Sequence, residues 1–298
     1  MNILVVGGSY FLGKCFVQMA AEKHQITVFN RGNRPLPLSG ITEVKGDRHN
    51  PLDIQALHGK SFDVVVDFCA YEKGDIRILF ENLHANFKQY IFISTCDVYE
   101  RGQGKLLSED APLEERNFGG EAGAYITGKV ALEKELIECG QKWQVAYTSI
   151  RPAFIYGADN YAPREGIYFH WIQQAGQILH PVDADGEFQM VYVEDVAKAV
   201  LAMAGNSEAY GQAYNLAPLP METYETFAAA LAESYPQPFE KVSVTLEMVQ
   251  EKEIPFPFPL TKAESNWYDG RKVLTLIGNY TSLSVGLKST IMQNIIRL

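Results

Sequence analysis

A phenol and an ammonium group stand four residues apart in the segment YITGK, as Tyr125 and Lys129. On a helix, residues at this spacing share one face, so the ammonium can lower the pKa of the phenol while the phenol exchanges a proton with a substrate oxygen. Thr95 follows an apolar run typical of a strand, and its hydroxyl can bond to the same oxygen. The three residues predict proton-transfer chemistry if a sheet brings Thr95 to that helix.

A glycine-rich turn, GGSYFLG, follows the first apolar run directly and opens a helical pattern. Glycines there allow a tight turn and let the helix N-terminus approach a pyrophosphate, whose charge the free N–H groups stabilise. The spacing is GxxGxxG except that Tyr10 takes the middle position, so we expect modest affinity. The turn predicts a dinucleotide site whose nicotinamide ribose Lys129 would hold; the alternative is a plain strand-to-helix turn. The predicted contacts in this turn are Gly7, Ser9, Tyr10, Phe11, Leu12 and Gly13.

The end of the second apolar run bears on which dinucleotide is bound. An NAD site normally carries a carboxylate there for the ribose 2′-OH, whereas this chain has Asn30 and Arg31. Arg31 could bind a 2′-phosphate, which favours NADP, or be a solvated loop residue. Asp47 and Arg48 lie in VKGDRH, Val44 to His49, where a carboxylate after a third strand can accept a bond from an adenine amino group; the alternative for Asp47 is a turn residue next to Gly46. We expect NADP or NAD, with these four residues among the contacts.

Short apolar runs rich in β-branched residues alternate with helical patterns in the first half of the chain. Such runs suit strands buried on both faces of a parallel sheet. The expected strands are Asn2 to Val6, Gln25 to Phe29, Asp63 to Asp67, Tyr90 to Ser94 and Val145 to Arg151, and the expected helices are Gly13 to Glu22, Leu52 to Leu57, Gly74 to Leu83 and Tyr125 to Cys139. The alternation predicts an α/β fold, a doubly wound parallel sheet (Rossmann) with a smaller α+β C-terminal substrate lobe.

The pattern becomes irregular after Gly157, with several glycines and prolines, before a helix and a strand return. We expect a dinucleotide-binding Rossmann domain at residues 1–157 and 186–217, and a substrate-binding lobe at 158–185 and 218–298. The two would share a cleft. Arg164 lies in the irregular segment and is a candidate for binding a substrate phosphate or carboxylate; the alternative is a solvated loop residue.

Composition excludes several classes of protein. With 36 acidic and 26 basic residues and a net charge of −10, the chain has no basic field, so nucleic-acid binding is not expected. Its 4 cysteines form no CxxC pair, which predicts no metal site and no disulfide framework and fits a reducing cytoplasm. The chain shows neither a secretion signal nor an apolar run near the ~18 residues of a membrane span, so we expect a cytoplasmic protein.

In these motifs and their order the chain resembles the extended (atypical) short-chain dehydrogenase/reductase superfamily, NAD-dependent epimerase/dehydratase family. The resemblance spans nearly the whole chain and includes FDVVVDFCAY, FISTCDVY, SIRPAFIYG, QMVYVEDVAKAV, AYNLA and SLSVGLKSTI. It implies that Thr95, Tyr125 and Lys129 form a catalytic trio. It also implies that Phe68, Cys69 and Ala70 border the cofactor.

The same resemblance implies an enzyme that transfers hydride at a carbinol or carbonyl carbon of a nucleotide-sugar-like substrate. A homodimer through the two helices that flank the active site is also implied. Two alternatives remain open: an NADPH-dependent reductase, and a non-catalytic nucleotide-sensing or RNA-associated member of the fold. The second arises because GGSYFLG, FNRG and GDRH look most like a branch that contains chloroplast stem-loop RNA-binding proteins.

The segment from Thr95 to Tyr99 resembles the Thr-Asp-Glu-Val-Tyr stretch of sugar-nucleotide dehydratases. Asp97 stands at the position of the family's base and is a candidate catalytic residue; the alternative is a residue that caps the turn after the strand. Cys96 replaces the acid, and a thiol with a pKa near ~8.5 is a poorer proton donor than a carboxylic acid. The exchange favours epimerisation over full dehydration.

Overall fold

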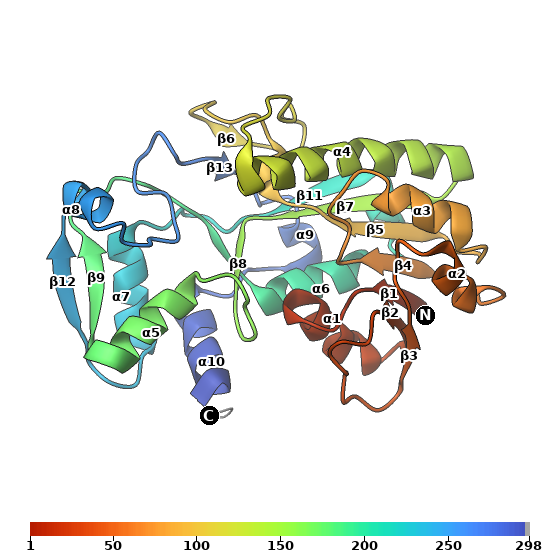
Figure 1. Cartoon of the computed structure of the whole chain (residues 1–298), viewed down its shortest axis with the longest axis horizontal. Helices are drawn as coiled ribbons and strands as arrows, with labels where there is room; N and C mark the ends of the chain where they lie inside the picture. Colours follow the sequence, from red (N-terminus) through yellow and green to blue (C-terminus); the bar gives the residue numbers. More distant parts are fainter. Residues whose placement is uncertain (296–298) are drawn as a thin grey trace.

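The computed structural model describes residues 1–295 and centres on a seven-stranded sheet of order β11-β7-β5-β4-β1-β2-β3 (Figure 1). Every pair of neighbouring strands in it is parallel. Its strands are β1 (Asn2–Val6), β2 (Gln25–Asn30), β3 (Ile41–Lys45), β4 (Val64–Asp67), β5 (Gln89–Ile93), β7 (Ala146–Pro152) and β11 (Gln212–Leu216). The predicted doubly wound parallel sheet is confirmed. Its order reverses between β1 and β4, and such a switch point is where open α/β sheets bind ligands.

Helices cover both faces of this sheet (Figure 1). They are α2 (Pro51–Ile54), α3 (Asp75–Asn82) and α4 (Gly120–Trp143) on one face, and α1 (Phe11–Ala21) and α6 (Val193–Met203) on the other. Two differ from expectation: α4 is longer at both ends than predicted, and the predicted Leu52 to Leu57 helix is one α turn followed by a 3₁₀ turn. Within residues 1–295, no helix is both long and apolar enough to cross a membrane.

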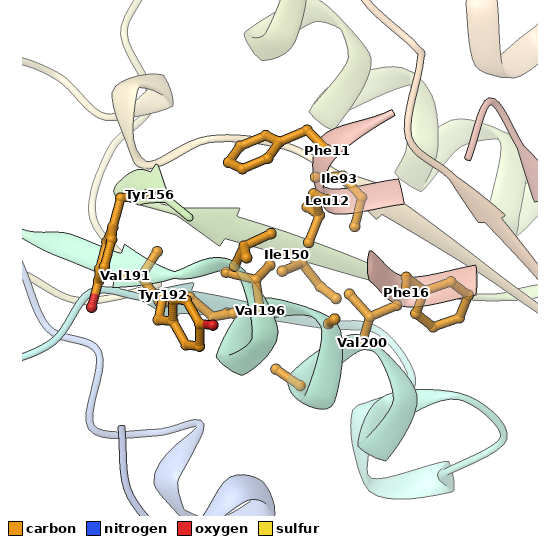
Figure 2. Close-up of a cluster of buried hydrophobic side chains, with 14 of the residues drawn as sticks. Phe11, Leu12, Phe16, Ile93, Ile150, Tyr156, Val191, Tyr192, Val196 and Val200 are labelled. Carbon is orange, nitrogen blue, oxygen red and sulfur yellow. The ribbon is translucent and has the colours of Figure 1, made fainter. Parts of the chain in front are cut away.

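Strand β1 shows why a continuous apolar run is needed at the centre of this sheet. Ile3 and Val5 point into the core beneath α1 and α6, while Leu4 and Val6 point into the core beneath α3 and α4. Figure 2 shows the first of these cores, where Phe16 of α1 and Val200 of α6 lie among the other apolar side chains. Burial on both faces fixes the strand, and with it the position of the turn that follows it.

A second lobe lies beside the sheet, on the left in Figure 1. Its elements are α5 (Glu165–Ala175), β9 (Gln177–Pro181), α7 (Tyr224–Ser234), β12 (Glu240–Val244), α8 (Leu246–Glu251) and α10 (Leu283–Ile295). Two short parallel pairs and one helix complete the chain: β8 (Phe154–Tyr156) with β10 (Met190–Tyr192), β6 (Leu106–Leu107) with β13 (Trp267–Tyr268), and α9 (Leu274–Ile277).

The main hydrophobic core continues from the sheet into this lobe. It joins Ile3 of β1 to Tyr168 of α5 and Phe227 of α7 in one cluster of buried side chains. The smaller lobe has helices and strands, as expected, but the predicted division at Gly157 stays a prediction. Residues 296–298 of the predicted lobe lie outside the described residues.

Candidate active site

A cleft of about 710 Å³ opens at the carboxyl ends of the sheet strands, beside the loop that follows β8. Most of the residues proposed from sequence line it. They are Gly7, Ser9, Tyr10, Phe11, Leu12, Gly13, Asn30, Arg31, Asp47, Arg48, Phe68, Cys69, Thr95, Asp97, Tyr125, Lys129 and Arg164. Ala70 is the exception: it is fully buried, and its carbonyl oxygen accepts a hydrogen bond from Lys129.

The glycine turn has the geometry that its spacing predicts. Gly7 and Gly8 have φ of +90° and +78°, in the region that favours glycine. A Cβ on Gly13 would lie 2.7 Å from the Cα of Gly8, so this glycine allows α1 to start close against the turn. Tyr10 is the N-cap of α1 in an extended conformation, and its side chain makes no capping bond. In α1, all of which is described, the first turn holds no acidic residue.

This turn fits an anionic group of a dinucleotide. An uncapped helix N-terminus offers N–H donors and a positive dipole end. Asn30, on the neighbouring strand, adds a second feature: its Oδ1 accepts a bond from the backbone N–H of Gly32 at 2.7 Å, while its buried Nδ2 has no partner among the described residues. A buried donor without a partner is costly unless a ligand takes its hydrogen bond.

Lys129 is buried at the side of the cleft, with 3% of its surface exposed. Its Nζ donates to the carbonyl oxygens of Ala70 and Ile93, each at 2.8 Å. It also lies 4.8 Å from the ring centroids of Tyr71 and Phe92. Burial lowers the pKa of Lys129 to about 8, against the opposing effect of nearby acidic groups such as Asp67. The two bonds leave one of the three N–H donors for a ligand.

Tyr125 and Thr95 meet in the cleft. Burial, followed by the nearby Asp97 and Tyr161, raises the pKa of the Tyr125 phenol above its ordinary value, and a hydrogen bond with Thr95 acts in the opposite direction. The Lys129 Nζ lies 5.8 Å from the Tyr125 ring centroid. The expected lowering of the phenol pKa by Lys129 stays a prediction. At neutral pH, the group is a phenol that can donate a proton.

Asp97 lies at the same end of the cleft but is already engaged. Its backbone N–H donates to Thr95 Oγ1 at 3.2 Å, and its carboxylate pairs with Arg101 at 3.0 Å. Thr95, rather than Asp97, caps the 3₁₀ turn Cys96–Val98. Cys96 is buried, and its Sγ contacts the carbonyl oxygen of Arg151 at 2.9 Å. The thiol thus stands outside the residues that line the cleft.

Arg48 is held chiefly by protein groups. It is buried, and its Nη1 donates to Asp67 Oδ1 at 2.8 Å, while Nη2 donates to the backbone oxygen of Asp75. Tyr90 donates to the other oxygen of Asp67. The pair fixes the loop after β3 to the end of β4, which makes Arg48 a positioning residue. Asp47 accepts the N–H of His49 at 2.9 Å, so its turn role is present whether or not it also binds adenine.

A buried network beneath α4 was not anticipated from the sequence. Glu133, one turn after Lys129, accepts two bonds from Arg151 at 2.9 Å and one from Ser149 at 2.6 Å. Arg151 also donates to Tyr99 at 2.8 Å. Burial opposes ionisation of Glu133, but Arg151 outweighs it and keeps the pKa of Glu133 below its ordinary value. The network locks the helix that carries Tyr125 and Lys129 onto β7.

We expect Glu133→Ala to lower the free energy of unfolding by about 3–5 kcal/mol, because it leaves the Arg151 charge buried and unpaired. Glu138, on the same helix, pairs with Arg77 at the surface and is 64% exposed, so Glu138→Ala should cost under about 1 kcal/mol. Urea denaturation of both variants tests this. Equal losses would show that the buried pair does not hold the helix in place.

The remaining candidates take structural as well as cleft positions. Arg164 donates to the carbonyl oxygen of Ile155 at 3.0 Å and lies 5.0 Å from the Phe154 ring, at the wall of the cleft. His180 pairs with Glu225 at 3.0 Å in the second lobe, and burial lowers its pKa. The spacing of the sequence gave no sign of that pair, because the two residues lie on different elements.

Comparison with known proteins agrees with this geometry. The model of the "NAD dependent epimerase/dehydratase family" matches residues 72–217, which carry Thr95, Asp97, Tyr125 and Lys129. This segment, just under half of the chain, is similar to the NAD-dependent epimerase/dehydratase family. The chain is also 30% identical over 255 residues to the chloroplast stem-loop binding protein of 41 kDa b from Arabidopsis thaliana, a match that covers 80% of this chain and 64% of that protein. That relative is chloroplastic by name, so a cytoplasmic location stays a prediction.

Solved epimerase and dehydratase structures share the fold over the full chain. UDP-glucuronic acid 4-epimerase from Bacillus cereus has a TM-score of 0.76 at 16% identity, with 100% of both chains covered. UDP-N-acetylglucosamine 4-epimerase from Methanobrevibacter ruminantium has a TM-score of 0.78 at 16% identity, covering 100% and 99%. dTDP-glucose 4,6-dehydratase from Bacillus anthracis has a TM-score of 0.73 at 17% identity, covering 99% and 97%. The chain therefore shares the overall fold of these structures.

Proposed function

We propose that this chain binds NAD or NADP in the cleft and is an NAD(P)-dependent epimerase/dehydratase-type enzyme acting on a nucleotide-sugar-like substrate. One observation carries the proposal: Thr95, Tyr125 and Lys129 line one cleft together with the glycine turn that follows β1. The similar structures in complex with UDP sugars and NAD support this class of substrate and cofactor.

The residues that would hold the dinucleotide follow the strand ends. The glycine turn and the α1 N-terminus would hold the pyrophosphate, Asn30 and Arg31 the adenosine ribose, and Lys129 the nicotinamide ribose. The nicotinamide, when bound, supplies a hydride acceptor and donor. The other roles in the reaction would be taken by side chains of this protein.

Tyr125 and Thr95 would handle the proton at the substrate oxygen. For oxidation of a carbinol, the Tyr125 phenol first loses its proton to solvent; the resulting phenolate takes the hydroxyl proton, and it returns that proton when the carbonyl is reduced. The Thr95 hydroxyl holds the substrate oxygen in line. The raised pKa of Tyr125 makes the resting group a proton donor. The ammonium of Lys129, whose Nζ lies 5.8 Å from the ring centroid, would favour the phenolate that oxidation requires.

The reaction class is tested by incubating the protein with a panel of nucleotide sugars and each dinucleotide. Epimerase or dehydratase chemistry changes the sugar with no net consumption of NAD(P)H, since the hydride returns to the substrate. Stoichiometric consumption of NADPH would favour the reductase. No change in any sugar, together with no cofactor binding, would contradict the enzymatic proposal. A homodimer through α4 stays a prediction.

Asp97 provides a finer test. If it removes an α-proton, a turned-over substrate in D₂O gains deuterium, and Asp97→Asn abolishes the gain. The Asp97 carboxylate lines the cleft and pairs with Arg101, whereas the Cys96 thiol contacts the carbonyl oxygen of Arg151, so we expect exchange without efficient loss of water. Mass spectrometry of the recovered sugar measures both. Dehydrated product, or deuterium gain that survives in Asp97→Asn, would refute this role.

The similarity to a stem-loop binding protein supports a second candidate, a nucleotide-sensing or RNA-associated protein. The net charge of −10 opposes a general electrostatic attraction to RNA. Such a protein would bind the dinucleotide, but its RNA affinity would not change in Tyr125→Phe. Gel-shift titration with stem-loop RNA, at several salt concentrations, separates this candidate from the enzyme.

A further inference from the structure

Tyr10 takes the position where GxxGxxG turns carry their middle glycine, and the structure shows what its side chain does. The Cζ of Arg34 lies 3.7 Å from the centroid of its ring. Tyr161, from the loop after β8, stacks on Tyr10 with centroids 5.6 Å apart and an interplanar angle of 27°. All three side chains line the cleft.

These contacts hold the ring of Tyr10 in place. Tyr161 also meets Phe11 edge-on at 6.0 Å, and Lys14 of α1 pairs with Asp159 of the same loop at 2.8 Å. Because Tyr161 is 65% exposed, its ring forms part of the rim of the cleft rather than of a core. The loop after β8 thus fixes Tyr10, and Tyr10 in turn fixes the position of Arg34.

The chemistry of a guanidinium on a ring face suits an anion. The Tyr10 ring contacts the face of the Arg34 guanidinium. The five N–H donors of the guanidinium lie in its plane, so they stay available for hydrogen bonds to a ligand. The ring that carries Arg34 belongs to the N-cap of α1, and the uncapped N-terminus of that helix also attracts an anion. A cation beside this N-terminus would strengthen the attraction that the helix dipole and the free N–H groups already exert on an anion.

We propose that Arg34, held on the ring of Tyr10, is a pyrophosphate-binding residue that compensates for the missing middle glycine. The glycine normally lets the backbone come close to the pyrophosphate, and the Cβ of Tyr10 prevents the closest approach. A side-chain cation carried by that same residue replaces the lost contact. This inference rests on the proposed dinucleotide site but assigns a residue and a role that the family motif does not contain.

The test is calorimetric titration of NAD and NADP into the wild type and Arg34→Met, which keeps an apolar chain over the ring. We expect both dissociation constants to rise together by about 10-fold or more, since each loses one charge-assisted contact. ADP-ribose, which has the pyrophosphate, should be affected equally, and AMP much less. Arg31→Met should weaken NADP more than NAD, and Arg77→Met, on the distant surface of α3, should change neither.

A double variant tests the compensation itself. Tyr10→Gly restores the middle glycine, so Tyr10→Gly with Arg34→Met should bind NAD more tightly than Arg34→Met alone. Equal binding in the wild type and Arg34→Met, a loss confined to NADP, or no recovery in the double variant would each overturn the inference. If the wild type binds neither dinucleotide, the proposed function fails and the inference falls with it; binding by the wild type that is unaltered in Arg34→Met sinks the inference alone.

Discussion

Tyr125→Phe is expected to lower turnover by about 10²- to 10⁴-fold, the usual contribution of a positioned acid or base. The substitution removes only the hydroxyl, so the ring still lies over Lys129 at 5.8 Å and still lines the cleft. Dinucleotide affinity should therefore be unchanged. The loss should appear equally in kcat and in kcat/KM, because the Tyr125 hydroxyl transfers a proton in the transition state and does not contribute to substrate binding.

Thr95→Val is the matched comparison for Tyr125→Phe. It removes the other hydroxyl from the substrate oxygen and should cost less, since the proton acceptor remains. The Thr95 hydroxyl also caps the following 3₁₀ turn, so the melting temperature must be measured beside the rate. Unchanged turnover in Tyr125→Phe would end the hydride-transfer account.

Lys129→Met should damage both dinucleotide binding and turnover. The ammonium donates to Ala70 and Ile93 and has one donor left for a ribose hydroxyl, and methionine supplies none of these bonds. A lost hydrogen bond to a charged group weakens binding by about 1.5–3 kcal/mol, which is roughly 10- to 100-fold. Weakened binding with full kcat would mean that Lys129 only binds.

The titration of Lys129 also predicts how dinucleotide affinity changes with pH. Its pKa is about 8 in the folded protein against 10.5 for the free group, so the ammonium is lost as pH rises through about 8. Dinucleotide affinity of the wild type should fall in that range, and Lys129→Met should show no such step. A step of equal size in the variant would assign the titration to another group.

Stability should change in the opposite direction over the same range. Because the folded-state pKa is lowered, the unfolded chain binds more protons near pH 8–10, and the penalty for burying the ammonium fades as pH rises. Relative to Lys129→Met, the wild type should gain about 2 kcal/mol in free energy of unfolding between about pH 7 and 9.5. Urea titrations at the two pH values measure this difference. If the difference in free energy of unfolding between the two proteins does not change with pH, burial does not disfavour the ammonium form of Lys129.

Local patterns were sufficient to predict most of the sheet and much of the site. Strand β3, none of whose residues is buried, was not among the strands expected from apolar runs. Strands such as Asn2–Val6 are buried on both faces, so their sequences are continuous apolar runs, a pattern typical of the centre of a parallel sheet. The glycine turn and YITGK lie within single stretches of sequence, and each was assigned to a helix start or a helix face from its spacing. Boundaries were less certain: α4 begins at Gly120, five residues before the predicted start, and both Gly120 and the N-cap Gly119 have positive φ.

Partners that come from distant segments could not be predicted in this way. Glu133 and Arg151 are 18 residues apart on a helix and a strand, and no periodicity relates them. Arg48 was proposed as a cofactor contact because it lies in GDRH, but the partner that fixes it, Asp67, ends a different strand. Arg34 gave no signal at all, since its role depends on the ring of Tyr10 lying beside it in the fold.

Calorimetric titration of the purified wild-type chain with NAD and NADP tests the central claim most directly, because it needs no knowledge of the substrate. A partner variant, Gly13→Val, places a side chain where even a Cβ would lie 2.7 Å from the Cα of Gly8, and circular dichroism checks that it still folds. The account predicts that the wild type binds at least one dinucleotide at one site per chain and that folded Gly13→Val loses this binding. Failure of the wild type to bind either dinucleotide, or equal binding by the folded variant, would contradict it.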